Sequence, residues 1–176
     1  MEGRPLNSVI RAQDGDADAF DELLERHASW VYRLAAAIVG PAEAADVTQD
    51  AFVRAWRELS RLREPDRFEA WLRRIVVNRC RDVRRRARAR VREIRMDTEL
   101  PSASTDPRVP IERDADLAAA LARLSVDHRT VLALHFGADL THQAVADTLE
   151  IPIGTVKSRL SAALERLRVD LAERDR

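Results

Sequence analysis

The sequence lacks the features of secreted and membrane proteins. It contains a single cysteine, Cys80, so no internal disulfide can form and an intracellular location is natural. No apolar run approaches the ~20 residues that are needed to span a bilayer. The N-terminus also lacks the apolar centre of a signal peptide. We therefore expect a cytoplasmic protein with no membrane insertion.

Glycine and strand patterns are scarce as well. The 176 residues include 5 glycines, while the helix formers Ala, Leu, Arg and Glu dominate. No segment shows a convincing apolar–polar alternation of the kind that predicts a strand. The expected fold class is all-α.

Few residues suggest catalysis or metal binding. We find no paired carboxylates beside a base and no glycine-rich phosphate loop. Of the 4 histidines, His128, His135 and His142 are spaced by seven, but Gly137 and Asp139 break the helix between the last two. We expect no enzyme activity, no metal site and no cofactor.

The net charge is zero, but the charges are segregated along the chain. Residues 61–95 carry 14 basic and 5 acidic side chains, whereas residues 1–60 carry 6 and 11. Residues 96–127 are again acidic, with 3 and 7, and residues 128–176 are balanced, with 7 of each. A basic block between acidic blocks indicates one surface for nucleic acid and another for a basic protein surface.

The basic block contains the most informative stretch, a helix expected from Phe68 to Arg92. Its apolar stripe, at spacings of three and four, consists of Phe68, Trp71, Leu72, Ile75, Val76, Cys80 and Val83. Nine arginines lie between Arg79 and Arg95, opposed by Asp82 and Glu93 alone. A solvated helix end accounts for two or three of them. We favour contact with nucleic acid, because guanidinium is a planar, permanently charged fork that suits phosphate.

Arg79 is the exception on this helix, because it falls on the apolar stripe. We expect it to pair with Asp82, or the helix to be leaving the core at this point.

The first 60 residues predict two further helices after a polar lead-in at 1–15. Asp16 or Asp18 can cap a helix that begins near Ala17. Gly40 followed by Pro41 ends that helix and starts the next, which runs to residue 59.

The 41–59 helix has two distinct faces. Its expected core face is Ala45, Phe52, Trp56 and Leu59, and a second face carries Asp46, Gln49, Asp50 and Val53. Asp46 and Asp50 are like charges one turn apart, which disfavours an isolated helix slightly and suits a basic partner. Alternatively, Asp50 pairs with Arg54 and Asp46 favours the helix start. The spacing alone leaves both interpretations open.

Two segments interrupt the helical pattern. Residues 60–67 form a short loop, in which Pro65 disfavours helix at Glu64 and Asp66 can cap the Phe68 helix. Residues 96–113 contain three prolines and no periodicity, which predicts a flexible linker. We expect small helical domains at 10–95 and 114–176, and the sequence leaves open whether they pack together when the protein is free.

Residues 114–176 predict four helices. Their expected apolar residues are Leu117, Ala120, Leu121 and Leu124, then Val131, Leu132, Leu134 and Phe136, then Val145, Ala146 and Leu149, then Val156, Leu160, Leu164 and Leu167. Ser125, Thr141 and Thr155 are the expected caps of the last three helices.

The last two of these helices have the pattern of a helix-turn-helix. A tight turn at 150–154 joins them, with the small Ala146 at the crossing and Ile151 plugging the turn. The first turns of the final helix carry Thr155, Lys157, Ser158, Arg159 and Ser161, which are placed to reach base edges and phosphates in a major groove.

Three segments in this order resemble a bacterial sigma factor of the extracytoplasmic-function (ECF) group, the minimal two-domain kind. Residues 45–56 (ADVTQDAFVRAW) resemble the helix that docks on the clamp helices of RNA polymerase. Residues 68–82 (FEAWLRRIVVNRCRD) resemble the helix that engages the −10 promoter element. Residues 140–168 (LTHQAVADTLEIPIGTVKSRLSAALERLR) resemble the helix-turn-helix that reads the −35 element.

The resemblance implies a promoter-specificity subunit of RNA polymerase, and it assigns roles to three sets of residues. The polymerase-binding set is Asp46, Gln49, Asp50 and Val53. The −10 set, in which loop 60–67 holds an extruded base, is Arg61, Arg63, Asp66, Arg74, Asn78, Arg79, Arg81 and Arg85. The −35 set is Thr155, Lys157, Ser158, Arg159 and Ser161. Trp71 is a family marker, but its place on the apolar stripe indicates the core.

The resemblance also implies partners. They are core RNA polymerase, promoter DNA that is duplex at −35 and melted at −10, and an anti-sigma factor, with a monomeric protein when free. The alternative is a stand-alone helix-turn-helix regulator that binds DNA as a dimer, which has no use for the 45–56 helix.

This chain departs from the family pattern in the turn of the helix-turn-helix. Glu150 stands where glycine is common, so a left-handed backbone there costs roughly 1 kcal/mol. Ser161 and Ala162 are small where other members carry larger contacts, and the −35 sequence preference is therefore open.

Overall fold

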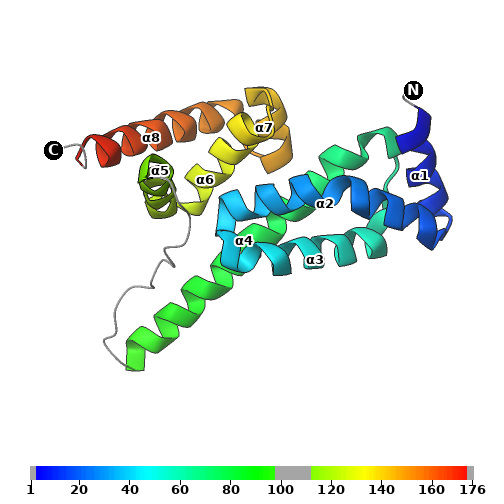
Figure 1. Ribbon diagram of the computed structural model, residues 1–176, viewed down its shortest axis with the longest axis horizontal. Helices are drawn as coiled ribbons and strands as arrows, with labels where there is room; N and C mark the ends of the chain where they lie inside the picture. The colour runs from blue at the N-terminus through cyan, green and yellow to red at the C-terminus, as the bar shows by residue number, and fades with distance from the viewer. Residues whose placement is uncertain (1–2, 98–111, 174–176) are drawn as a thin grey trace.

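The computed structural model describes residues 3–97 and 112–173, and its regular elements in these ranges are all helical (Figure 1). The helices are α1 (Gly3–Gln13), α2 (Ala17–Val39), α3 (Pro41–Glu58), α4 (Phe68–Asp97), α5 (Glu112–Arg123), α6 (Val126–Leu132), α7 (His142–Leu149) and α8 (Ile153–Ala172). Short turns η1 (Leu59–Arg61), η2 (Pro65–Arg67) and η3 (Ala133–Gly137) join some of them. The all-α prediction is confirmed.

The N-terminal unit consists of α1–α4, with α2, α3 and α4 packed on one another. Its most deeply buried side chains are aliphatic and come from each of these three helices: Leu23, Val31, Ile38, Val47, Leu72, Val76 and Val77. Asp16 caps α2 by accepting a hydrogen bond from the Ala19 N–H at 3.0 Å, as predicted. Gly40 adopts a φ of 103°, which an L side chain disfavours, and Pro41 begins α3.

The prediction of a polar lead-in at 1–15 is wrong, because α1 is a helix that packs against α2. It buries Val9 and Ala12, which are 2% and 4% exposed. The Gln13 amide then donates to the carbonyls of Leu59 (3.0 Å) and Leu62 (2.7 Å). The first helix therefore fixes the start of the 60–67 loop.

The predicted core face of α3 was placed partly on the wrong side. Phe52 and Leu59 are buried, but Ala45 is exposed and Trp56 is 42% exposed. The buried face instead carries Ala44, Val47, Ala51 and Ala55. Small side chains let α2 and α4 approach α3 closely, and the larger Trp56 is left at the rim beside Phe20, with ring centroids 4.8 Å apart.

The C-terminal unit consists of α5–α8 around Leu134, Val131, Val145 and Val156, each fully buried. Ser125 and Thr141 cap α6 and α7 as predicted. Thr155 does not cap α8: that helix begins at Ile153 with Pro152 as its N-cap. Pro152, with φ near its fixed value, supplies the extended cap residue three positions earlier than expected.

Phe136 was predicted in the core but is 62% exposed. The reason is η3, a turn of π-helix, in which each turn contains an extra residue, so the phase of the apolar side chains changes after Leu134. Leu117 and Leu164, also expected inside, are 41% and 46% exposed.

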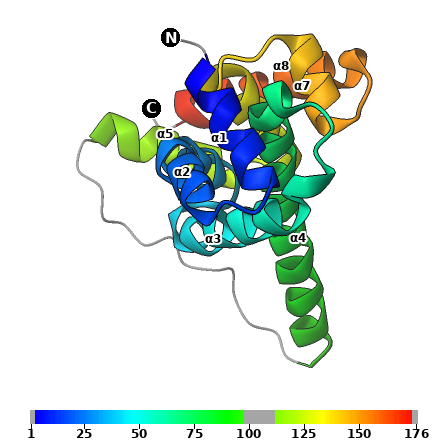
Figure 2. The same ribbon diagram turned by 90° about the vertical axis from the view of Figure 1, so that its right-hand side faces the viewer.

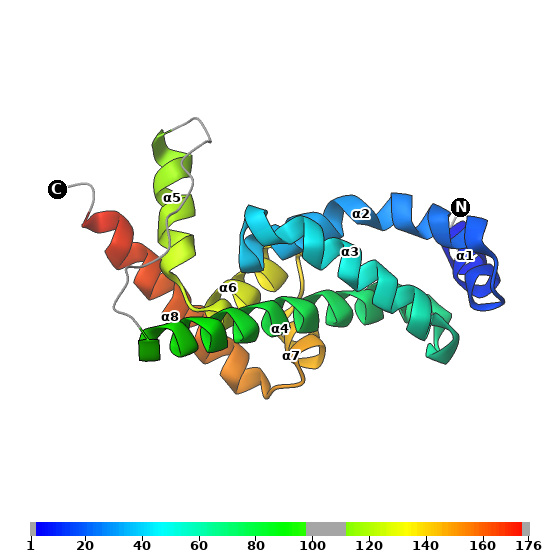
Figure 3. The ribbon, with the colours of Figure 1, turned by 90° about the horizontal axis from the view of Figure 1, so that it is seen from below.

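The two units pack against each other, which the sequence left open. Helices α6 and α7 and turn η3 contact α2 and α4, and a single cluster of buried side chains includes residues of both units. Figures 2 and 3 show α7 beside the first half of α4, whose second half projects beyond α2 and α3. In the described ranges, no helix is long and apolar enough to cross a membrane.

Candidate nucleic-acid and polymerase interfaces

Helix α4 combines a core stripe with a row of arginines. Phe68, Leu72, Val76 and Cys80 are at most 3% exposed, which confirms the predicted stripe, while Trp71 and Val83 are half-buried. Asn78 and Arg85 are exposed, and Arg81 is half-buried. The stripe therefore fixes the rotation of the helix and directs these polar side chains outward. The side chains of Arg88, Arg90, Arg92 and Arg95 lie outside the described residues.

Arg79 pairs with Asp50 of α3 rather than with Asp82. Its Nε lies 3.0 Å from the carboxylate, and the Arg79 side chain is 19% exposed. Asp82 pairs with Arg85 at 3.0 Å, and Arg54, the other expected partner of Asp50, pairs with Glu58 at 3.0 Å. Arg79 lies on the apolar stripe because α3 presents a carboxylate to that stripe. One ion pair thus joins a predicted polymerase-binding residue to a predicted −10 residue.

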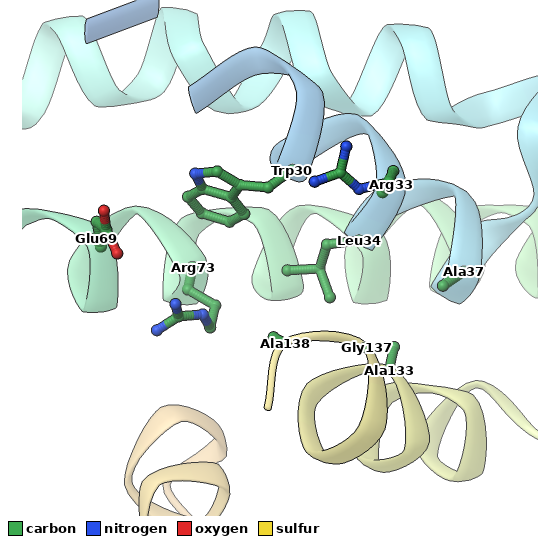
Figure 4. Close-up of a pocket in the computed structure, with 9 residues that line it drawn as sticks. All are labelled: Trp30, Arg33, Leu34, Ala37, Glu69, Arg73, Ala133, Gly137 and Ala138. Carbon is green, nitrogen blue, oxygen red and sulfur yellow. The ribbon is translucent and has the colours of Figure 1, made fainter. Parts of the chain in front are cut away.

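Two further arginines of α4 face the C-terminal unit. Arg73 lies over the ring of Trp30, 5.6 Å from its centroid, and burial lowers the pKa of its guanidinium. Figure 4 shows both side chains at a pocket of about 350 Å³ that also meets Ala133, Gly137 and Ala138. Arg74, a predicted −10 residue, pairs with Glu150 in the turn after α7.

The 60–67 loop borders a hollow of about 520 Å³ between the two units. Its walls are Leu62, Arg63, Glu64 and Arg67 of the loop, Ala70, Trp71, Arg73 and Arg74 of α4, and Ala144, Asp147 and Thr148 of α7. Arg63 and Arg74 are thus brought together, whereas Arg61 and Asp66 are exposed and do not line it. Turn η2 leads directly into α4 at Phe68. Trp71, assigned to the core from its position, also lines this hollow.

The acidic face of α3 lies beside an apolar groove. Asp46, Gln49 and Val53 are exposed and Asp50 is half-buried. Gln49 and Val53 also line a groove of about 750 Å³ between α2 and α3, together with Phe20, Leu24, Ala28, Tyr32, Ala45, Thr48, Phe52, Trp56 and Arg57. Sequence reasoning missed the α2 side of this surface. The signal was present in Tyr32 and Leu24, which lie at helical spacing from Ala28.

Helix α8 presents the predicted −35 residues on its outer side. Lys157, Ser158 and Ser161 are exposed, while Thr155 and Arg159 are half-buried. Arg159 pairs with Asp127 of α6 at 3.2 Å, and the Ser158 hydroxyl donates to the Thr155 carbonyl at 3.0 Å. Val145 and Ala146 of α7 and Val156 of α8 are buried. The α7–turn–α8 unit therefore has the form of a helix-turn-helix with a polar reading face.

Groups that could support other chemistry are few in the described ranges. The rings of His135 and His142 lie 4.7 Å apart, and His135 Nδ1 is 2.7 Å from the Leu140 carbonyl oxygen. Even so, the residues that the structure describes contain no group of three or more side chains that could hold a metal ion. Burial raises the pKa of the Cys80 thiol to about 12, so this thiol is not activated as a nucleophile.

Comparison with protein families matches both units. The model for sigma-70 region 2 matches residues 23–90, and the model for sigma-70 region 4 matches residues 120–169. The chain is 35% identical to the ECF RNA polymerase sigma factor SigE of Mycolicibacterium smegmatis, over 96% of this chain and 69% of that protein. It is 37% identical to the ECF RNA polymerase sigma factor SigM of Mycobacterium tuberculosis, over 87% of this chain and 77% of that protein.

Solved structures of similar fold cover both units as well. CnrH, in complex with the cytosolic domain of CnrY, matches with a TM-score of 0.68 and 27% identity, over 97% of this chain and 98% of that chain. The sigma factor RpoE of Bartonella quintana, in complex with the anti-sigma factor NepR, matches with a TM-score of 0.69 and 25% identity, over 87% and 96%.

Proposed function

The chain belongs to the extracytoplasmic-function group of sigma-70 RNA polymerase sigma factors, and we propose how its surfaces divide the work. As a sigma factor it directs transcription initiation at promoters, and a stand-alone regulator is excluded because region 2 occupies residues 23–90. The observation that carries the division is that each sigma region presents a polar helix face of its own. These faces are on α3 and α4 in region 2 and on α8 in region 4.

The exposed face of α3 docks on core RNA polymerase. Asp46, Gln49, Asp50 and Val53 combine carboxylates with an exposed apolar side chain beside the α2–α3 groove. An acidic edge beside an apolar surface suits a partner helix that has basic residues at its edge. The resemblance of 45–56 to the clamp-binding helix of the family supports the same partner.

The −10 element binds along α4 and the 60–67 loop. Arg63 and Arg74 line a hollow with Trp71, which offers guanidinium groups for phosphate and a ring for a base. Asn78, Arg81 and Arg85 continue the polar face along α4, and Arg79 joins them by exchanging Asp50 for a phosphate. Arg61 and Asp66 are exposed on the loop. Extrusion of a base costs a few kcal/mol, which stacking and hydrogen bonds in such a hollow offset.

The −35 element binds α8 as a duplex. Lys157 and Arg159 can reach guanine edges or phosphates, and Thr155, Ser158 and Ser161 supply small hydroxyl contacts. The corresponding division of the chain is 10–95 for region 2, 96–113 for the linker and 114–176 for region 4. Most of the linker lies outside the described residues, and α1 extends the packed N-terminal unit to residues before 10.

The remaining assignments follow from this role. The protein is an initiation factor and not an enzyme, because catalysis belongs to the polymerase, and it works in the cytoplasm where the polymerase is. CnrH and RpoE were each solved with a partner, which for RpoE is an anti-sigma factor. We therefore assign this chain an anti-sigma partner of its own, and a monomeric state when free of it.

The test combines capture of core RNA polymerase with run-off transcription on genomic fragments. Wild-type protein should bind the core enzyme and produce new start sites. Asp46→Arg should lower core binding by at least about tenfold, because a charge reversal at a docking edge meets like charge on the partner. Asp46 is exposed and is preferred to Asp50 for the test, since Asp50 also holds Arg79.

Glu165→Arg is the matched control, an equal charge reversal at an exposed residue of α8. It should leave capture of the core enzyme unchanged. Equal losses for the two variants would refute the docking face, and failure of the folded wild-type protein to bind core polymerase would refute the whole division of labour.

A further inference from the structure

The helix-turn-helix lies against the proposed −10 surface in the free protein. Asp147 and Thr148 of α7 line the same hollow as Arg63, Arg74 and the 60–67 loop, and α7 packs on α4. Figure 3 shows α7 beside α4. A single strand of DNA that enters this hollow would therefore contact α7 as well as α4 and the loop.

Glu150 contributes an ion pair to the contact between α7 and α4. It follows α7 in the left-handed conformation, with φ 55° and ψ 45°, and its N–H closes the helix on the Ala146 carbonyl. Glycine adopts this conformation without penalty, whereas a residue with a Cβ does not. The strained position thus carries a long acidic side chain, and its carboxylate pairs across the two units with Arg74.

We propose that Glu150 is an autoinhibitory latch: its carboxylate occupies Arg74 in place of a DNA phosphate and holds the helix-turn-helix over the −10 surface. The strained turn is the local cost of placing that carboxylate. Binding to polymerase, which must engage both regions on separate promoter elements, opens the latch and frees Arg74. This inference rests on the proposed −10 role of Arg74 and the hollow.

Buried arginines where the two units meet increase the importance of this ion pair for the closed state. Arg129 of α6 is 6% exposed, and its Nε has no hydrogen-bond partner in the structure. The Nε atoms of Arg73 and Arg84, on the α4 side, are likewise buried without a partner. Buried donors without acceptors oppose closure. These donors oppose the apolar contacts that the two units share, and the cross-unit carboxylate of Glu150 adds to the side of closure.

The expected size of the effect follows from exposure. The Arg74 and Glu150 side chains are 45% and 71% exposed, so water and salt weaken their attraction. Pairs of this kind shift an equilibrium by about two- to fivefold. The latch is thus weak enough for polymerase or DNA to release.

The test is Glu150→Gly in the full chain, with two readouts. The first is the distance between the units, from fluorescence energy transfer between dyes on cysteines introduced at the exposed Ser29 of α2 and Arg168 of α8. Buried Cys80 should not label. The second is affinity for a short single-stranded DNA that carries the non-template −10 sequence found by run-off transcription. The variant should raise the open fraction and the strand affinity together by about two- to fivefold.

Two further variants separate charge from strain. Glu150→Asn removes the carboxylate but keeps a residue that tolerates the left-handed region, and it should open the units like Glu150→Gly. Asp139→Gly is the matched control, because Asp139 is the other non-glycine residue with positive φ in the described ranges, at 51°. It should relieve similar strain and leave both readouts unchanged.

The outcomes distinguish the latch from the function on which it rests. An unchanged distance in both Glu150 variants overturns the latch. If the units open but strand affinity does not rise, the autoinhibitory role is overturned. Strand binding by Arg74→Ala then shows whether the −10 assignment or only the latch is wrong. Undiminished strand binding in Arg74→Ala means that the −10 assignment has failed, whereas reduced binding means that the latch alone has failed.

Discussion

Helices α4 and α8 both carry residues assigned to DNA, but they hold them in different states. On α4, Arg74, Arg79 and Arg85 pair with Glu150, Asp50 and Asp82, and Arg73 lies over Trp30. On α8, Lys157, Ser158 and Ser161 are exposed on one outer face, and Arg159 pairs with Asp127. The arginines of α4 must therefore exchange their carboxylate partners for DNA phosphates. Most of the polar side chains on α8 have no such partner to release among the described residues and can enter the major groove of duplex DNA directly.

This difference separates affinity from sequence readout. Exchange of one anion for another depends on salt and carries no base information, so α4 should supply general affinity. A fixed polar face on a recognition helix meets base edges in one register, so α8 should supply discrimination. Variants of α4 and of α8 should therefore have different effects on affinity and on discrimination.

The largest effect is expected for Lys157→Ala with Arg159→Ala. Each lost base-edge contact should reduce −35 discrimination by about 1–3 kcal/mol, while capture of core polymerase survives. The measurement compares affinity for a duplex with the −35 sequence against a scrambled duplex. Arg166→Ala with Arg168→Ala is the control, since it removes equal charge from exposed positions later on α8. If this control abolishes discrimination equally, the discrimination depends on the total charge of α8 and not on which of its side chains face the bases.

A smaller and sequence-independent effect is expected for Arg81→Ala with Arg85→Ala. Loss of two phosphate contacts to a single strand should lower the slope of log affinity against log salt by about 1.4. Titrations of −10 and unrelated single strands over a range of salt provide the slope. Selective loss for the −10 strand alone would contradict the division, because these arginines would then be reading bases.

The sequence predicted those parts of the structure that depend on local periodicity and capping. The α4 stripe from Phe68 to Cys80 has one hydrophobic period, so its buried face could be assigned directly. Asp16, Ser125 and Thr141 cap their helices through side-chain oxygens, which is a local preference. The positive φ of Glu150 also follows from the tight turn of a helix-turn-helix.

The incorrect predictions concern residues whose positions depend on distant contacts or on irregular turns. Arg79 pairs with Asp50, 29 residues away, and no pattern within α4 encodes that choice. Phe136 is exposed because the π-turn of η3 changes the helical phase, which a 3.6-residue period does not contain. Trp56 lies at a rim because alanines, rather than large side chains, form the close packing of α3.

The candidate site residues likewise include some whose positions follow from local sequence and some whose positions depend on distant contacts. The exposure of Lys157, Ser158 and Ser161 follows from helical phase. The hollow between Arg63, Arg74 and Trp71 requires the fold of both units, because α7 supplies one of its walls.

The smallest expected effect is on the pH dependence of stability, and it concerns the histidines of the two units. His27 of α2 is 3% exposed, accepts a hydrogen bond from Trp30 Nε1 at 2.8 Å, and packs against Phe68. Burial lowers the pKa of His27 below its ordinary value of 6.5, opposed by the charge of Glu69 and reinforced by that of Arg26. The unfolded chain therefore binds a proton first as the pH falls. Stability is fully present above about pH 6.5 and decreases below it.

Tryptophan fluorescence isolates this effect, because Trp30, Trp56 and Trp71 are the 3 tryptophans of the chain and all lie in the N-terminal unit. The urea midpoint of the wild-type protein should fall between about pH 7.5 and about pH 5.5, the range in which histidine titrates. His27→Gln keeps an acceptor for Trp30 and should flatten that fall, and His135→Gln in the C-terminal unit is the matched substitution for comparison. An equally steep fall in His27→Gln would place the acid sensitivity elsewhere. A flattened fall would show that the N-terminal unit, which holds the paired arginines, also carries a proton-sensitive core.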